Sequence, residues 1–133
     1  MTSSPGPAGE RKPAALSVLV VEDEKDLRTA IRDVLFTRGC SVDTAESGSE
    51  ALRHVLGRDY QVVISDVHIP KVNGIELARL LSRRIHSPRI ILLTADPDPE
   101  TVREAYSAGA SHCLAKPISL TALSRVVEEL GSG

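Results

Sequence analysis

Four short apolar runs, each followed by a polar residue, constrain the fold of this chain more than any other feature. The runs occupy residues 18–21, 62–65, 90–93 and 112–115. The polar residues that follow them are Glu22 and Asp23, then Asp66, Thr94 and Lys116. The nearly continuous run over residues 60–65 is typical of a strand that is buried on both faces, as in a parallel sheet.

Strand patterns and helix patterns alternate five times along the chain. Helix boundaries are marked by Gly39 and Gly109 at expected ends and by Ser47, Asp98 and Ser119 at expected starts. The second helix is expected to bury one face, formed by Ala51, Leu52, Val55 and Leu56. Five such strand–helix units predict an α/β fold, a doubly wound parallel sheet in a three-layer α/β/α arrangement.

Length and composition predict a single domain. A chain of 133 residues with 41% hydrophobic residues can bury one core. Residues 1–15 hold three prolines and two glycines without apolar periodicity, so we expect a disordered tail there. The domain is expected over residues 16–130, with a C-terminal tail or linker at 131–133.

Charge and composition argue against several classes of protein. The net charge of −2 and the three aromatic residues do not suit direct binding of nucleic acid. No apolar stretch approaches the roughly 18–20 residues that span a membrane. The two cysteines, in a chain without a secretory signal, are expected to be reduced thiols in the cytoplasm.

The polar residues at the strand ends suit one kind of chemistry. Ligand sites of parallel sheets lie outside the carboxyl ends of the strands, so three carboxylates, one hydroxyl and one ammonium are expected in one crevice. Clustered carboxylates suit a hard cation such as Mg²⁺, which also binds phosphate oxygens. A lysine beside that cation suits a phosphoryl oxygen. The set predicts a site for phosphoryl transfer.

Motifs at the strand ends give the chain a family resemblance. They are Val-Glu-Asp-Glu at 21–24, Ser-Asp-Val-His-Ile-Pro at 65–70 with Asn73 and Gly74, Leu-Thr-Ala at 93–95, and Gly-Ala at 109–110 with Ala-Lys-Pro at 115–117. In this order and spacing they resemble the receiver domain of two-component response regulators. The resemblance implies a flavodoxin-like sheet with the strand order 2-1-3-4-5.

The resemblance also implies a role for each site residue. Asp66 would accept a phosphoryl group from a sensor histidine kinase or a histidine phosphotransfer protein, which makes the chain a signalling switch. Lys116 would pair with Asp66 or with a phosphoryl oxygen, and Thr94 would hydrogen-bond another phosphoryl oxygen. A cis peptide bond would join Lys116 to Pro117. Mg²⁺ would be held by Glu22, Asp23, Asp66 and the main-chain carbonyl of His68.

By the same resemblance the chain is a cytoplasmic, bacterial phosphoacceptor rather than an enzyme, although it assists its own phosphotransfer and autodephosphorylation. The resemblance further implies a phosphorylation-dependent dimer of this chain through a face made by the fourth helix, the fifth strand and the fifth helix. Two positions depart from the family pattern. Glu22 stands where an aspartate is common, and Cys113 stands where the family usually has Tyr or Phe.

Three other functions suit these residues less well. An aspartyl phosphatase of the haloacid dehalogenase family has a second acid two residues after its nucleophile, where this chain has His68. A flavodoxin needs small residues after its first strand, where acids stand here. A pseudo-receiver would lack part of the site. The sequence leaves open whether an effector domain follows, which kinase is the partner, and which process is controlled.

Overall fold

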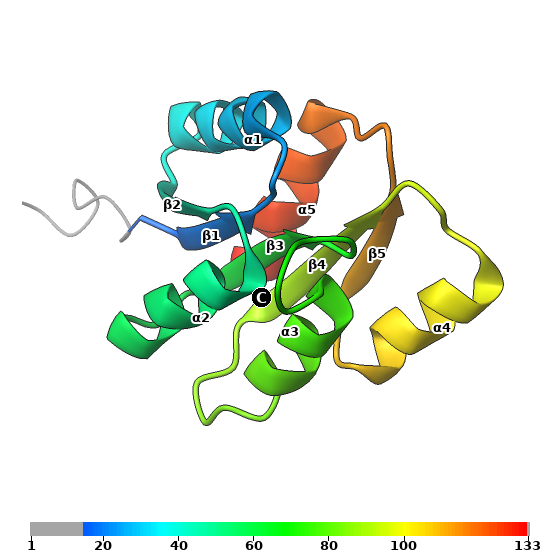
Figure 1. Ribbon diagram of the computed structural model, residues 1–133. Helices are drawn as coiled ribbons and strands as arrows, with labels where there is room; N and C mark the ends of the chain where they lie inside the picture. The colour runs from blue at the N-terminus through cyan, green and yellow to red at the C-terminus, as the bar shows by residue number, and fades with distance from the viewer. Residues whose placement is uncertain (1–14, 133) are drawn as a thin grey trace, which may run out of the picture.

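The computed structural model describes residues 15–132, so the tail expected over residues 1–15 lies outside the described part except for Ala15. Strands and helices alternate throughout. The elements are β1 (Ser17–Val21), α1 (Lys25–Thr37), β2 (Ser41–Ala45), α2 (Gly48–Gly57), β3 (Val62–Asp66), α3 (Gly74–Leu81), β4 (Arg89–Thr94), α4 (Pro99–Ser107), β5 (His112–Ala115) and α5 (Leu120–Ser132). The strands form one sheet in the order β2-β1-β3-β4-β5, and each neighbouring pair is parallel (Figure 1). The predicted strand order is therefore confirmed.

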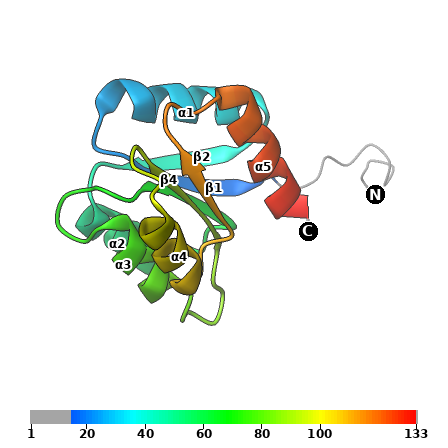
Figure 2. The ribbon, with the colours of Figure 1, turned by 90° about the vertical axis from the view of Figure 1, so that its right-hand side faces the viewer.

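The helices cover both faces of the sheet. Figure 2 shows α1 and α5 on one face and α2, α3 and α4 on the other. Each face has its own apolar core, with Leu35 and Leu123 on the α1–α5 side and Leu77 and Leu81 on the other side. All five residues of β3 are buried, because this central strand has a neighbour on each side and helices on each face. The continuous apolar run of the sequence has this origin.

Side-chain caps define the starts of several helices. The Ser47 Oγ accepts a hydrogen bond from the Glu50 amide at 3.2 Å, and the Asp98 Oδ1 accepts one from the Thr101 amide at 2.9 Å. Ser119 likewise accepts a hydrogen bond from the Ala122 amide at 3.2 Å. The three predicted caps are thus confirmed, and each satisfies an amide that has no partner within its helix.

The structure corrects three expectations. Leu56 is 78% exposed, so its expected place on the buried face of α2 is wrong; it follows Val55 by one residue, about 100° around the helix. The strand expected over residues 60–65 is β3, which begins at Val62, so the buried Tyr60 lies before the strand. Helix α5 continues to Ser132, so the tail expected at 131–133 is part of a helix up to that residue.

Other expectations agree with the structure. The peptide bond between Lys116 and Pro117 is cis. Cys40 and Cys113 are both free thiols. Among the residues that the structure describes, no helix has the length and apolar character that a membrane crossing requires.

Two glycines at helix ends allow a matched test of backbone conformation. A Cβ atom at Gly39 or at Gly57 would meet no atom within 4 Å, but only Gly39 has a positive φ, of 90°. We expect Gly39→Ala to lower the free energy of unfolding by about 1–2 kcal/mol, since an L-residue is strained in the left-handed region. Gly57→Ala, at the end of α2, should raise it by up to about 1 kcal/mol. Urea unfolding followed by circular dichroism measures both, and equal losses would contradict the prediction.

Candidate functional site

The predicted site residues gather at the carboxyl edge of the sheet. Asp66 and Thr94 are the last residues of β3 and β4, and Glu22, Asp23 and Lys116 directly follow β1 and β5. The strands are in register there: the Lys116 amide donates to the Thr94 carbonyl at 2.8 Å, which joins the ends of β4 and β5. Sequence positions far apart thus share one edge because parallel strands end together.

Asp66 is held from two sides. Its side chain is 9% exposed, its Oδ1 accepts a hydrogen bond from the His68 amide at 3.0 Å, and its Oδ2 forms an ion pair with the Lys116 ammonium. Gly74 lies directly over the Asp66 backbone, and a Cβ at this position would collide with the Asp66 carbonyl oxygen. The missing side chain at Gly74 therefore lets the loop after β3 fold back over the strand end.

Glu22 is almost fully buried beside this pair. Its Oε1 accepts a hydrogen bond from the Lys116 Nζ at 3.1 Å, and its Oε2 accepts one from the Glu24 amide at 3.0 Å. Burial raises the pKa of Glu22 above its ordinary value, and these two hydrogen bonds offset part of that effect. The glutamate at this position thus shares the lysine with Asp66.

The Lys116 ammonium is the cation between these two carboxylates. Burial by itself would lower its pKa, but the hydrogen bonds and negative charges of Asp66 and Glu22 outweigh burial and raise the pKa above its ordinary value. The amine is therefore held in its charged form. A charged donor at this place can bind a carboxylate or another anionic oxygen.

Three carboxylates of the site can hold a metal ion. One oxygen each from Glu22, Asp23 and Asp66 lies within 4.8 Å of the others. Asp23 is exposed while the other two residues are buried, so this cluster opens to solvent on the Asp23 side. Carboxylate oxygens are ligands for hard divalent cations, so the donor set suits such an ion.

Thr94 and His68, the remaining predicted site residues, differ in exposure. The Thr94 residue is fully buried, and its Oγ1 accepts a hydrogen bond from the Asp96 amide at 3.0 Å. His68, in the loop after β3, is exposed. The backbone amide of His68 donates a hydrogen bond to the Asp66 side chain.

Sequence reasoning missed Arg28, on α1. Its guanidinium donates hydrogen bonds to the carbonyl oxygens of Glu22 and Asp23. An arginine inside a helix carries no motif that distinguishes it from a surface residue, and the available signal was its position five residues after Asp23.

On β5, the Cys113 amide donates a hydrogen bond to the Tyr106 hydroxyl at 3.2 Å. This tyrosine of α4 therefore reaches the strand on which Cys113 stands in place of the expected aromatic residue.

The shared lysine gives a prediction about stability. Lys116→Met leaves two buried carboxylates without their cation, so in the presence of a chelator it should lower the free energy of unfolding by about 2–4 kcal/mol. The loss should be smaller in a Glu22→Gln background, where one of the two charges is already removed. Arg38→Met is the control: its ion pair with Glu128 is exposed, and its loss should cost less than about 1 kcal/mol. Urea unfolding measures all variants, and equal losses in both backgrounds would show that Glu22 and Lys116 are not coupled.

Comparison with known proteins identifies the family. The family model described as the response regulator receiver domain matches residues 18–128. The sensor protein EvgS of Escherichia coli K12 is 33% identical over 118 residues, which cover 89% of this chain and 10% of EvgS. The transcriptional regulatory protein CutR of Streptomyces coelicolor is 34% identical over 116 residues, which cover 87% of this chain and 54% of CutR. The chain thus spans about half or less of the length of these curated relatives.

Solved structures agree with this assignment. The chemotaxis response regulator CheY4 of Vibrio cholerae superimposes with a TM-score of 0.82 at 28% identity, covering 88% of this chain and 99% of CheY4. The receiver domain of Ssk1 from Saccharomyces cerevisiae, solved together with the histidine phosphotransfer protein Ypd1, gives a TM-score of 0.80 at 27% identity, covering 89% of this chain and 90% of that one. The fold, the acidic strand ends and the family match lead to one conclusion: the chain belongs to the receiver domains of two-component signalling systems.

Proposed function

We propose that this receiver is switched by transfer of a phosphoryl group to Asp66. The observation that carries the proposal is the setting of this carboxylate: it ends the central strand, it is nearly buried, and it pairs with the Lys116 ammonium. A carboxylate oxygen of Asp66 attacks the phosphorus of a phosphohistidine, the P–N bond breaks, and the imidazole leaves. The product is an aspartyl phosphate, whose charge Lys116 is placed to neutralise.

The remaining site residues support the same reaction. Thr94, at the end of β4, would donate its hydroxyl to a phosphoryl oxygen. Glu22, Asp23, Asp66 and the main-chain carbonyl of His68 would hold Mg²⁺, which when bound neutralises charge on the phosphoryl oxygens. The three-carboxylate cluster and its opening at Asp23 support this assignment.

The proposed reaction is a stoichiometric switch and not turnover of a free substrate. Water later hydrolyses the acyl phosphate, which restores Asp66 and releases phosphate. A dedicated hydrolase of the haloacid dehalogenase type would have an acid two residues after its nucleophile. Here that residue is His68, which is exposed and is not a member of the carboxylate cluster, and this favours a receiver over a hydrolase.

The partner is proposed to be a sensor histidine kinase or a histidine phosphotransfer protein. The matched structure of a receiver with a histidine phosphotransfer protein and the match to a sensor protein support this class of partner. We place the receiver at residues 16–130 plus the end of α5, in the bacterial cytoplasm, without direct contact to nucleic acid or membrane. Phosphorylation-dependent dimerisation through α4, β5 and α5 is part of the same proposal.

The first test of this proposal labels the acceptor. Incubation with acetyl phosphate and Mg²⁺ should add one phosphoryl group, about 80 Da, to the intact protein as measured by mass spectrometry. Asp66→Asn should abolish the added mass, because the amide is not a nucleophile. Asp59→Asn, at an exposed aspartate just before β3, should leave labelling unchanged. Equal labelling of the Asp66→Asn protein would refute Asp66 as the acceptor.

The second test concerns the metal. Millimolar Mg²⁺ should raise the melting temperature by a few degrees, because an ion that binds the folded state stabilises it by mass action. A chelator should reverse the shift, and Asp23→Asn should remove most of it. Asp33→Asn, an exposed acid on α1 outside the cluster, is the matched control. Each variant is compared with its own metal-free melting temperature, and a full shift in Asp23→Asn would exclude Asp23 as a ligand.

A further inference from the structure

Arg28 contacts the backbone of Glu22 and Asp23, the first two residues after β1. It lies in the second turn of α1, and its side chain is only 13% exposed. Its Nη1 donates to the carbonyl oxygen of Glu22 at 2.9 Å and also reaches that of Asp23 at 3.4 Å. Its Nη2 lies 4.0 Å from an Oε2 of Glu46.

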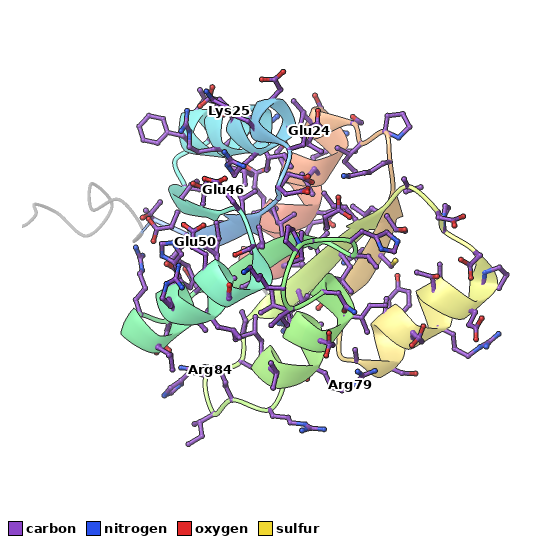
Figure 3. The ribbon with its side chains drawn as sticks, viewed as in Figure 1. Glu24, Lys25, Glu46, Glu50, Arg79 and Arg84 are labelled. Carbon is purple, nitrogen blue, oxygen red and sulfur yellow. The ribbon has the colours of Figure 1, made fainter. Side chains whose placement is uncertain are left out.

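Through these contacts Arg28 reaches two loops, the one after β1 and the one after β2. Glu46 lies between β2 and α2, and Figure 3 shows it between the ribbons of α1 and α2. The hydrogen bonds of the guanidinium are thus to the loop after β1, and its contact with the loop after β2 is an ion pair with an exposed carboxylate. Glu24, the N-cap residue of α1, makes no side-chain capping hydrogen bond, so this helix begins without the usual N-cap interaction. Arg28 holds this junction from inside the helix.

The backbone that Arg28 holds is the one that carries the Asp23 side chain. Glu22 is already fixed by burial, by Lys116 and by the Glu24 amide. Asp23 is exposed, and it lies at the open side of the carboxylate cluster. A rotation of the Asp23 peptide would turn its carboxylate away from Asp66, so the position of the third carboxylate depends on its main chain.

The charge of Arg28 acts in the opposite direction from its hydrogen bonds. A guanidinium near the cluster repels an incoming divalent cation, and its removal would by itself tighten cation binding. Loss of the carbonyl contacts would loosen the loop and weaken cation binding. The sign of the change in affinity therefore separates the two effects.

We propose that Arg28 is a positioning residue for the carboxylate cluster: by holding the carbonyls of Glu22 and Asp23 it keeps the Asp23 carboxylate in place and so sets the affinity for a divalent cation. The inference rests on the proposed function for the identity of that cation as Mg²⁺. In this inference Arg28 is not a ligand of the cation, and it acts through the backbone of Glu22 and Asp23.

The test compares the wild-type protein with Arg28→Met, Arg28→Lys and Arg32→Met. Arg32 lies on the same helix, is about half exposed and pairs with its neighbour Asp33, so it is the matched control. Titration with MgCl₂, followed by amide chemical shifts, gives the dissociation constant of each protein. Arg28→Met should weaken binding by about tenfold or more, as loss of a group that orients metal ligands does. Arg28→Lys keeps the charge but has no planar guanidinium, so its dissociation constant should lie between those of the wild type and Arg28→Met. The dissociation constant of Arg32→Met should match that of the wild type.

Phosphorylation provides a second readout of the same variants. With acetyl phosphate, Arg28→Met should need about tenfold more Mg²⁺ for half-maximal labelling, while its rate at saturating Mg²⁺ stays within about threefold of wild type. A general loss of structure would instead lower the rate at every Mg²⁺ concentration. Urea unfolding identifies any variant that fails to fold, and Arg28→Lys then carries the comparison.

Hydrogen exchange separates this inference from the proposed function. With Mg²⁺ removed by a chelator, the amides of Asp23 and Glu24 should exchange faster in Arg28→Met than in Arg32→Met. If the wild-type protein showed no response to Mg²⁺, the proposed metal site would fail, and exchange would still decide whether Arg28 holds the loop. Unchanged exchange, or a dissociation constant that is unchanged or lower in Arg28→Met, would overturn the inference.

Discussion

The Lys116 ammonium between two buried carboxylates is the interaction on which the rest of the site depends. Glu22 and Asp66 lie on neighbouring strands, and without a cation their charges would repel each other in a setting with little water. Both carboxylates raise the pKa of Lys116, which keeps the amine charged. The same ammonium is placed to meet the charge that a phosphoryl group would bring to Asp66.

The topology of the sheet is what brings the site residues together. The order β2-β1-β3-β4-β5 puts β1 directly beside β3, although β2 and α2 separate them in the chain. The crossovers cover both faces of the sheet and leave its carboxyl edge to the loops. Gly74 lets one loop pack on Asp66, and Arg28 braces another. The edge is thus open to solvent while its main chain is held.

Glu22 and Cys113, the two positions that depart from the pattern expected of receivers, make their own local contacts within the five-stranded fold. Glu22 has one more methylene than aspartate, and its carboxylate reaches Lys116 as well as the Glu24 amide. Cys113 brings a small thiol to β5, whose pKa burial raises, and the Tyr106 hydroxyl contacts the amide of the same residue from α4. Family membership therefore follows from the motifs at the strand ends and from the family match, whereas these contacts come from the structure of this chain.

The sequence by itself determined the fold class, the order of elements, the helix caps and the residue types at each strand end, because these follow from local periodicity and from motifs with a fixed spacing. It did not determine that Leu56 of α2 is exposed, since a shift of one residue around the helix decides whether a side chain faces the core or solvent. The sharing of Lys116 by Glu22 and Asp66, the exposure of Asp23 and the contacts of Arg28 were decided only by the tertiary structure. The reason is physical: each depends on how far a side chain reaches between strands and loops that are distant in the chain, and that distance exists only after the sheet has assembled.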